Sequence, residues 1–289
     1  MDDQNSATDV VRRIKDEVAR ATSSVEVANF ARGMINDAAD RTAAAFKTAV
    51  RPIWGVNKQL HPVSRGSCVL LEIGAERFIL TAAHVADFIR DSVLYIGLDR
   101  LELLPNTFET TIAPDGCRNR DTMDFAIMRF PPGLMTKLGE ATFIPEISIG
   151  VGERIEKRTF TCLGYPTKMN MPSRTQPNMV RGKLMSHTSR GRLSSTLPGI
   201  AVNGTHILVD RHAKHARNSA GLKVGAFSGN GMSGGGIFDV GELGSPTSIF
   251  MPEPPRIAAI TTEGFSSQKV IMGTRIDAII RGLKRQNWL

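Results

Sequence analysis

The sequence has little of what would carry a chain into or across a membrane. No stretch of its 289 residues approaches the roughly 18 uninterrupted apolar residues of a membrane span. Its first six residues are acidic and polar, whereas a secretory signal starts with basic residues and continues with an apolar run. We therefore expect a cytoplasmic protein with no membrane span.

Cysteine is also scarce. Cys68, Cys117 and Cys162 are odd in number and widely spaced, which is a poor basis for a disulfide framework. None of them has the close pairing typical of zinc sites. We expect all three cysteines to be reduced and inert, and we expect neither a metal nor a cofactor.

Negative charge is almost missing from one segment. The formal net charge of the chain is +8, and residues 168–223 hold ten basic residues and a single acidic one, Asp210. The segment lacks the interleaved aromatic side chains that stack on bases, so nucleic acid is not expected as a partner. Its charge fits a solvated face, acidic protein substrates or another anionic partner.

The first 52 residues are patterned differently from the rest and predict an N-terminal helical extension, residues 1–52. Apolar residues recur at helical spacing in Val10, Val11, Ile14 and Val18. Ser23 and Glu26 fit a capping box that starts a second helix, which runs to about Thr48 and is ended by Pro52. The extension either packs on the remaining chain or forms an arm that binds a regulatory partner.

Beyond residue 60, short apolar runs separated by turns favour an all-β barrel or sandwich. Residues 67–73 and 77–81 form a predicted hairpin. Further predicted strands cover residues 93–97, 125–130, 158–163, 206–209, 236–239, 256–262 and 270–272. A closing amphipathic helix is predicted by the spacing of Ile276, Ile279, Ile280 and Leu283.

The motif Gly231-Met232-Ser233-Gly234-Gly235 has the features of a nucleophile turn. Glycines permit a tight turn that exposes the serine hydroxyl, and the backbone amides of such a turn can stabilise an oxyanion. By itself the motif fits the nucleophile elbow of α/β-hydrolases, the serine loop of trypsin-like enzymes, or a plain glycine-rich turn.

The order of the other residues separates the two enzyme classes. An α/β-hydrolase places its histidine after the serine, but all six histidines here precede Ser233. His84 lies in Thr81-Ala82-Ala83-His84, directly after an apolar run. Asp124 opens the apolar run that begins with Phe125, whereas its neighbours Asp115 and Asp121 do not. The order His, Asp, Ser is that of the trypsin-like triad.

These motifs resemble those of trypsin-like (chymotrypsin-fold) serine proteases, and among them bacterial and HtrA-like peptidase domains. Gly164-Tyr165-Pro166 and the strand 257–264 resemble further segments of that family, so the resemblance covers about residues 60–280. It implies two six-stranded antiparallel β-barrels within residues 53–289. The first would cover about residues 60–145, the second about 150–275, and a closing helix 275–289.

The resemblance also implies roles for individual residues. His84, Asp124 and Ser233 would form the catalytic triad of an intracellular serine endopeptidase that acts on proteins or peptides, and the amides of Gly231, Met232 and Ser233 its oxyanion hole. Substrate-binding positions would fall on Phe227, Thr262, Glu263, Gly264 and Ile271. The bulk of Phe227 and Ile271 predicts a shallow, uncharged specificity pocket. Glu263 either favours a basic subsite or is simply exposed to solvent.

Two departures from secreted family members are informative. Secreted trypsins bridge a cysteine after the catalytic histidine to an earlier one, but Val85 follows His84 while Cys68 lies near the earlier position. Secreted zymogens carry an aspartate where Met232 stands. We expect no PDZ domain after the protease domain, because only a short helix remains there. The alternative to an active protease is a latent trypsin-like fold used for binding or regulation.

Overall fold

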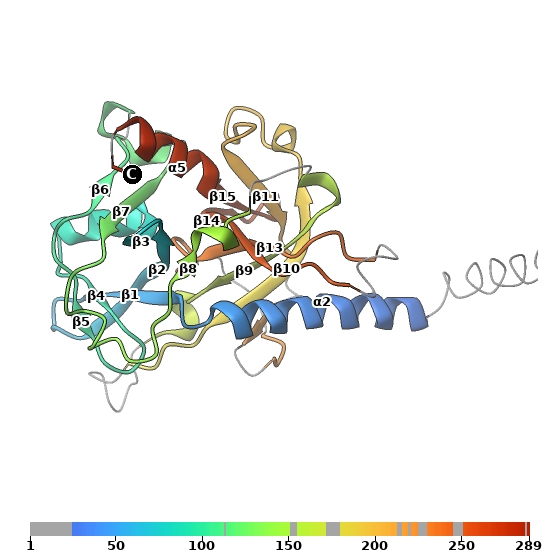
Figure 1. Cartoon of the computed structure of the whole chain (residues 1–289), viewed down its shortest axis with the longest axis horizontal. Helices are drawn as coiled ribbons and strands as arrows, with labels where there is room; N and C mark the ends of the chain where they lie inside the picture. Colours follow the sequence, from blue (N-terminus) through green and yellow to red (C-terminus); the bar gives the residue numbers. More distant parts are fainter. Residues whose placement is uncertain are drawn as a thin grey trace, which may run out of the picture.

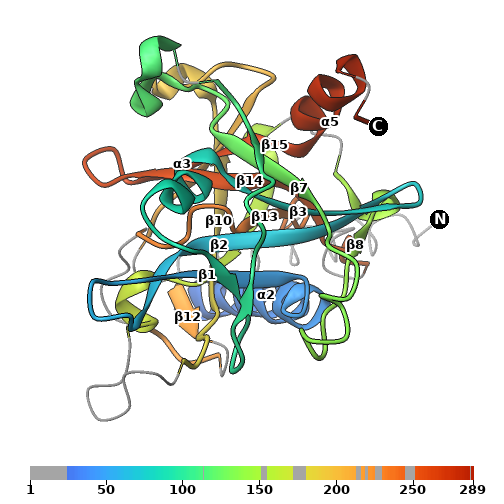
Figure 2. The ribbon, with the colours of Figure 1, turned by 90° about the vertical axis from the view of Figure 1, so that its left-hand side faces the viewer.

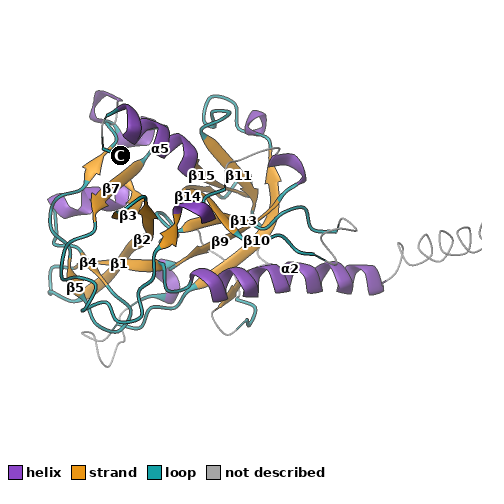
Figure 3. Ribbon diagram, in the orientation of Figure 1, coloured by secondary structure: helices purple, strands orange, loops and turns teal. Residues whose placement is uncertain are grey.

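The computed structural model describes residues 25–112, 114–150, 155–171, 180–212, 216–218, 221–224, 230–244, 251–286 and 288–289. Two β-sheets dominate it, with helices on their outer sides (Figures 1 and 3). None of the helices in these ranges is long and apolar enough to cross a membrane. The predicted helix at Val10–Val18 and the residue Ser23 lie outside the described residues.

The first sheet is built from the amino-terminal strands. Its strand order is β5-β4-β1-β2-β3-β7-β6, with β8 joined to β2 in parallel, and all other pairings in it are antiparallel. The strands are β1 (Val50–Val56), β2 (Pro62–Ile73), β3 (Glu76–Ala82), β4 (Tyr95–Ile96), β5 (Glu102–Leu103), β6 (Glu109–Thr110), β7 (Phe125–Arg129) and β8 (Ile144–Pro145).

The second sheet closes on itself. Its order is β11-β15-β14-β13-β9-β10-β12, and an additional pairing of β10 with β11 joins six of these strands into a ring. The strands are β9 (Thr159–Gly164), β10 (Met185–Arg192), β11 (His206–Asp210), β12 (Ala216–Asn218), β13 (Gly236–Asp239), β14 (Arg256–Phe265) and β15 (Val270–Arg275).

This architecture confirms the predicted all-β, chymotrypsin-like fold with a helix near each end of the chain. The described strand counts differ from the expected two sets of six: the first sheet has eight strands, and the second has seven, of which six form the ring. All nine predicted strands fall on observed ones. β10 escaped prediction because its sequence, Met-Ser-His-Thr-Ser-Arg-Gly-Arg, is polar, although its first five residues are buried.

Strand β1 begins inside the region predicted as helical. The helix α2 (Val25–Phe46) ends at Phe46, and β1 starts four residues later, so Pro52 lies within a strand and does not end the helix. Pro52 pairs with Ser67 of β2, whereas the pairing of β1 with β4 covers only Ile53 and Trp54. Proline is tolerated there because its missing N–H falls where β1 has one neighbour only.

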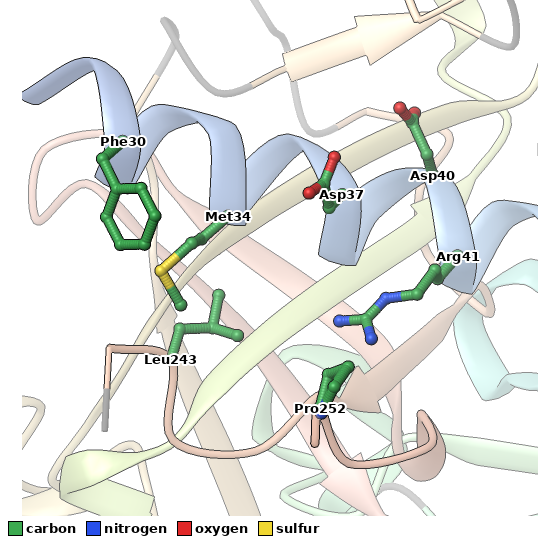
Figure 4. A pocket seen from close by; sticks show the side chains of 7 residues that line it. All are labelled: Phe30, Met34, Asp37, Asp40, Arg41, Leu243 and Pro252. Atoms are coloured by element: carbon green, nitrogen blue, oxygen red, sulfur yellow. The ribbon is translucent and has the colours of Figure 1, made fainter. Parts of the chain in front are cut away.

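Helix α2 is anchored by its carboxyl-terminal half. Ala38, Ala39, Thr42 and Phe46 are buried, and the Phe46 ring stacks on Phe238 of β13 with centroids 4.5 Å apart. The amino-terminal half is more exposed and borders a pocket of about 390 Å³. Figure 4 shows Met34 of α2 facing Leu243 across this pocket, with Phe30 beside them.

Helix α5 (Ile276–Arg285) confirms the predicted closing helix, and both views of the chain place it on the other side of the strands from α2 (Figures 1 and 2). It buries Ile276, Ile279 and Leu283. These residues join one hydrophobic cluster with residues of both sheets, including Leu71 and Ile260. The two sheets therefore share a core, and their loops meet at a fixed junction.

Candidate active site

His84 stands where strand β3 gives way to the short helix α3 (Ala83–Ala86). The strand is buried through Ala82, while the His84 side chain keeps 37% of its surface exposed at the edge of a pocket. Val85 is fully buried in a cluster that also holds Cys68. Both residues thus belong to one apolar cluster of the first sheet.

Asp124 precedes β7, which pairs with β3 so that Phe125 lies opposite Ala82. This pairing brings Asp124 beside His84. One carboxylate oxygen lies 2.7 Å from His84 Nδ1, and the other accepts the backbone N–H of His84 at 3.0 Å. The backbone of Asp124 has φ of +37°, a conformation that costs energy outside glycine and is often found at functional sites.

Ser233 lies in a turn directly before β13. Gly231 (φ +89°) and Gly234 (φ +82°) adopt left-handed conformations in this turn. A Cβ on Gly234 would lie 2.0 Å from the carbonyl oxygen of Ser67, so only glycine fits there. The Ser233 hydroxyl donates a hydrogen bond to the Thr262 carbonyl at 3.2 Å.

The three side chains border one pocket of about 350 Å³. It lies where the ends of β3 and β7 meet the loop before β13 and the second half of β14. Its lining residues are His84, Arg118, Asn119, Asp121, Asp124, Asn230, Ser233, Thr262, Glu263, Gly264 and Met272. The structure thus brings together His84, Asp124 and Ser233, which are separated by 40 and 109 positions in the sequence.

The peptide between Asn230 and Gly231 has a defined orientation. The Asn230 carbonyl accepts the N–H of Thr167 at 2.9 Å. In a trans peptide the N–H points opposite to the carbonyl, so the N–H of Gly231 is directed away from Thr167. The turn therefore leaves this amide free of the loop behind it, as an oxyanion donor requires.

Ser67 of β2 ties the serine loop to the first sheet. Its backbone N–H donates to the Ser233 carbonyl at 2.8 Å. Its buried hydroxyl donates to the Gly231 carbonyl at 2.9 Å and accepts the N–H of Tyr165, also at 2.9 Å. No sequence motif pointed to this role, because a lone serine in an apolar strand carries no signal of its distant partners.

His206 of β11 ties the Asp124 loop to the second sheet. Its Nε2 donates to the Thr122 carbonyl, and its Nδ1 accepts the N–H of Val202 at 2.8 Å. Thr274 of β15 adds a bond from its hydroxyl to the Met123 carbonyl at 2.6 Å. Burial lowers the pKa of His206, which agrees with a neutral ring that both donates and accepts.

The predicted substrate-binding residues fall in different places. Thr262, Glu263 and Gly264 line the pocket that His84, Asp124 and Ser233 also border. Ile271 points instead into the core cluster of the second sheet, and its neighbour Met272 lines the pocket. Because strand side chains alternate between faces, a shift of one residue exchanges the two roles. Phe227 lies outside the described residues.

The remaining predictions concern charge, thiols and metals. All three cysteines are free, and burial raises the pKa of the Cys68 and Cys162 thiols to about 12, so both stay protonated. In the part of the chain that the structure describes, no group of three or more His, Cys, Asp and Glu side chains is placed to hold a metal ion. Within residues 168–223, Arg192 is already paired with Asp210.

No protein-family profile and no curated protein matches this sequence. Among solved structures, the chain resembles the HtrA-type protease AlgW with tripeptide (16% identity, TM-score 0.47), covering 84% of this chain and 62% of that one. It also resembles Glu endopeptidase in complex with MPD (15% identity, TM-score 0.45), covering 82% of this chain and 90% of that one. The chain thus spans about three-fifths of the AlgW chain. Both structures are of trypsin-like serine proteases, and at these identities the likeness is one of fold.

Proposed function

We propose that this protein is a serine endopeptidase with His84, Asp124 and Ser233 as its catalytic triad. The observation that carries the proposal is the pair of bonds from Asp124 to the ring and backbone of His84, at the pocket that Ser233 also lines. A carboxylate on Nδ1 holds the tautomer in which Nε2 is free to accept a proton, which a general base needs.

In the proposed reaction, His84 Nε2 takes the proton of the Ser233 hydroxyl as Oγ attacks the scissile carbonyl. The amides of Gly231 and Ser233, with that of Met232 nearby, stabilise the oxyanion that forms. The C–N bond then breaks, and His84 gives its proton to the leaving amine. Water attacks the acyl-enzyme in the same way, with His84 again as base, and restores Ser233.

One adjustment precedes attack. Ser233 Oγ donates to the Thr262 carbonyl in this structure, so its hydroxyl must turn about χ1 to donate to His84. Rotation between staggered rotamers is available to a serine that is only partly buried. Substrate that pairs with β14 would compete for the Thr262 carbonyl and release the hydroxyl.

A fluorophosphonate probe tests the assignment. It should label the wild-type chain, and Ser233→Ala should abolish the labelling. Asp124→Asn should lower peptide turnover by about 10⁴-fold, because the imidazole would lose its tautomer. Ser267→Ala, which removes an exposed hydroxyl in the turn after β14, is the matched control and should label normally. Full labelling of Ser233→Ala would refute the proposal.

The bond from Ser233 to Thr262 also favours a second candidate, a latent fold that serves mainly in binding. If the wild-type chain is folded but the fluorophosphonate probe does not label it, whatever the concentration of added peptide, that result would support this alternative. The cytoplasmic location stays a prediction, which cell fractionation tests, and so does a regulatory partner at the N-terminal helices.

A further inference from the structure

The catalytic pocket is acidic, although the chain as a whole carries a net charge of +8. One cation, Arg118, lines the pocket together with three carboxylates, Asp121, Asp124 and Glu263. The local charge is therefore opposite to that of the whole protein. A cleft lined by one sign of charge selects ligands of the other sign.

The charge of Arg118 is already compensated within the protein. Its Nε and one terminal nitrogen bind both oxygens of Asp87 at 2.7 and 3.1 Å, and its other terminal nitrogen binds Asp121 at 2.5 Å. Two carboxylates thus surround one guanidinium. Arg118 has no charge left over for an acidic substrate side chain or for Glu263.

Asp124 is likewise committed, because both of its oxygens bind His84. Glu263 is different. Partial burial raises the pKa of Glu263 most, and the nearby carboxylate of Asp124 raises it further, whereas His84 lowers it. No lysine or arginine of the described chain forms an ion pair with Glu263, so its charge faces the pocket unpaired.

Strand β14 offers Glu263 to a peptide. The pairing of β13 with β14 ends at Ile260, so residues 262–265 keep a free edge on that side among the described residues. An extended peptide can add a strand to such an edge. The pairings of β14 with its neighbouring strands β13 and β15 are antiparallel, and an antiparallel peptide on the free edge would run toward Ser233. The residues before its scissile bond would then lie along Thr262, Glu263 and Gly264.

We infer that the protein selects peptides with a lysine or arginine among the three residues that precede the scissile residue, through an ion pair with Glu263. The inference rests on the proposed protease function and names its substrate class. It goes beyond the uncharged pocket expected for the scissile residue itself, because the selected cation occupies a neighbouring subsite.

A positional peptide series tests this substrate class. Lysine, norleucine and glutamate are placed in turn at each of the three positions, since norleucine keeps the apolar stem of lysine without its charge. At one position lysine should raise kcat/KM over norleucine roughly two- to fivefold, and glutamate should lower it, as is typical of an ion pair with an exposed carboxylate. Raising the salt from about 50 mM to about 500 mM should shrink the ratio.

Variants identify the residue responsible. Glu263→Gln should bring the lysine-to-norleucine ratio close to one. Glu156→Gln removes the same charge from an exposed position outside the pocket and should leave the ratio unchanged. A ratio that Glu263→Gln does not alter, or the absence of a lysine preference at all three positions, would overturn the inference while leaving the protease function intact.

If no peptide is cleaved, a binding measurement distinguishes a failure of the proposed protease function from a failure of the inferred role of Glu263. The Ser233→Ala chain should bind the lysine peptide more tightly than the norleucine peptide, and Ser233→Ala with Glu263→Gln should bind them equally. That result without any cleavage or probe labelling would contradict the proposed activity and support the role of Glu263. If both variants bind the lysine peptide and the norleucine peptide equally well, Glu263 does not have that role.

Discussion

The two loops that carry the candidate nucleophile and the candidate carboxylate are held in opposite ways. The Ser233 loop belongs to the second sheet, but Ser67 of the first sheet binds its backbone. The Asp124 loop belongs to the first sheet, but His206 and Thr274 of the second sheet bind its backbone. Each sheet therefore fixes the other's functional loop, so the site depends on the junction rather than on either sheet alone.

The contacts that hold the Ser233 loop differ in chemistry from those that hold the Asp124 loop, and this difference sets how much stability a change at each loop is expected to cost. The Ser233 loop meets Ser67 at van der Waals limits, with glycine backbone against strand backbone. The Asp124 loop is held by side chains that reach across the junction, one of them titratable. We expect steric changes at the Ser233 loop to lower the free energy of unfolding most, and protonation at the Asp124 loop to lower it least.

The largest effect is expected for Gly234→Ala. Its Cβ would meet the Ser67 carbonyl at 2.0 Å and the Thr81 hydroxyl at 2.2 Å, and its φ is unfavourable for alanine. The free energy of unfolding should fall by about 3–5 kcal/mol, as measured by urea denaturation. Gly282→Ala, in α5 with no neighbour within 4 Å, should instead raise stability by about 0.5–1 kcal/mol. Equal effects of the two changes would contradict the steric argument.

Ser67→Ala should have an intermediate effect. It leaves the buried N–H of Tyr165 and the carbonyl of Gly231 without their hydroxyl partner, which costs about 1–3 kcal/mol. Probe labelling should slow more than the loss of stability alone explains, because the Gly231 carbonyl belongs to the turn that we propose to stabilise the oxyanion. Ser64→Ala removes a buried hydroxyl from the same strand that has no hydrogen-bond partner, so it should be nearly neutral. Unchanged labelling of Ser67→Ala would show that Ser67 does not position the turn.

The smallest effect is expected from the pH dependence of His206. Its folded-state pKa lies below the ordinary value of 6.5, so the unfolded chain binds the proton more readily. Its contribution to stability is therefore complete above pH 6.5 and declines as the pH falls from 6.5 toward the lower folded-state pKa. We expect a small loss of stability over this range, measured by denaturation across pH 5–7.

His206→Gln keeps a donor for the Thr122 carbonyl but cannot titrate, so stability should depend less on pH in this variant. His61→Gln, on the loop between β1 and β2, should retain the wild-type dependence on pH. If His206→Gln and the wild type lose stability in parallel, protonation of His206 does not loosen the Asp124 loop.

Much of the fold followed from local patterns. Apolar runs predicted nine of the described strands correctly, because a strand buried on one or both faces must be apolar there. The two-residue strands β5, β6 and β8 and the short strand β12 were not predicted, because so few residues form no recognisable run. Strand β10 was missed because its buried polar residues are satisfied by partners far along the chain: Thr188 shares a hydrogen bond with Thr161, and His187 binds the carbonyl of Asp210. Strand β1 was missed because Pro52 ends helices more often than it enters strands.

The sequence by itself determined the strand texture, the closing helix and the three residues proposed for catalysis, since glycine turns and strand ends restrict the backbone locally. Only the tertiary structure decided that Ser67 and His206 hold the loops of the candidate site, and that Met272 rather than Ile271 borders the pocket. It also decided that, among the described residues, Glu263 has no cationic partner while Arg118 is compensated. These features depend on contacts between residues up to 164 positions apart, and a sequence pattern specifies which residues are buried or turned but not which distant residues they meet.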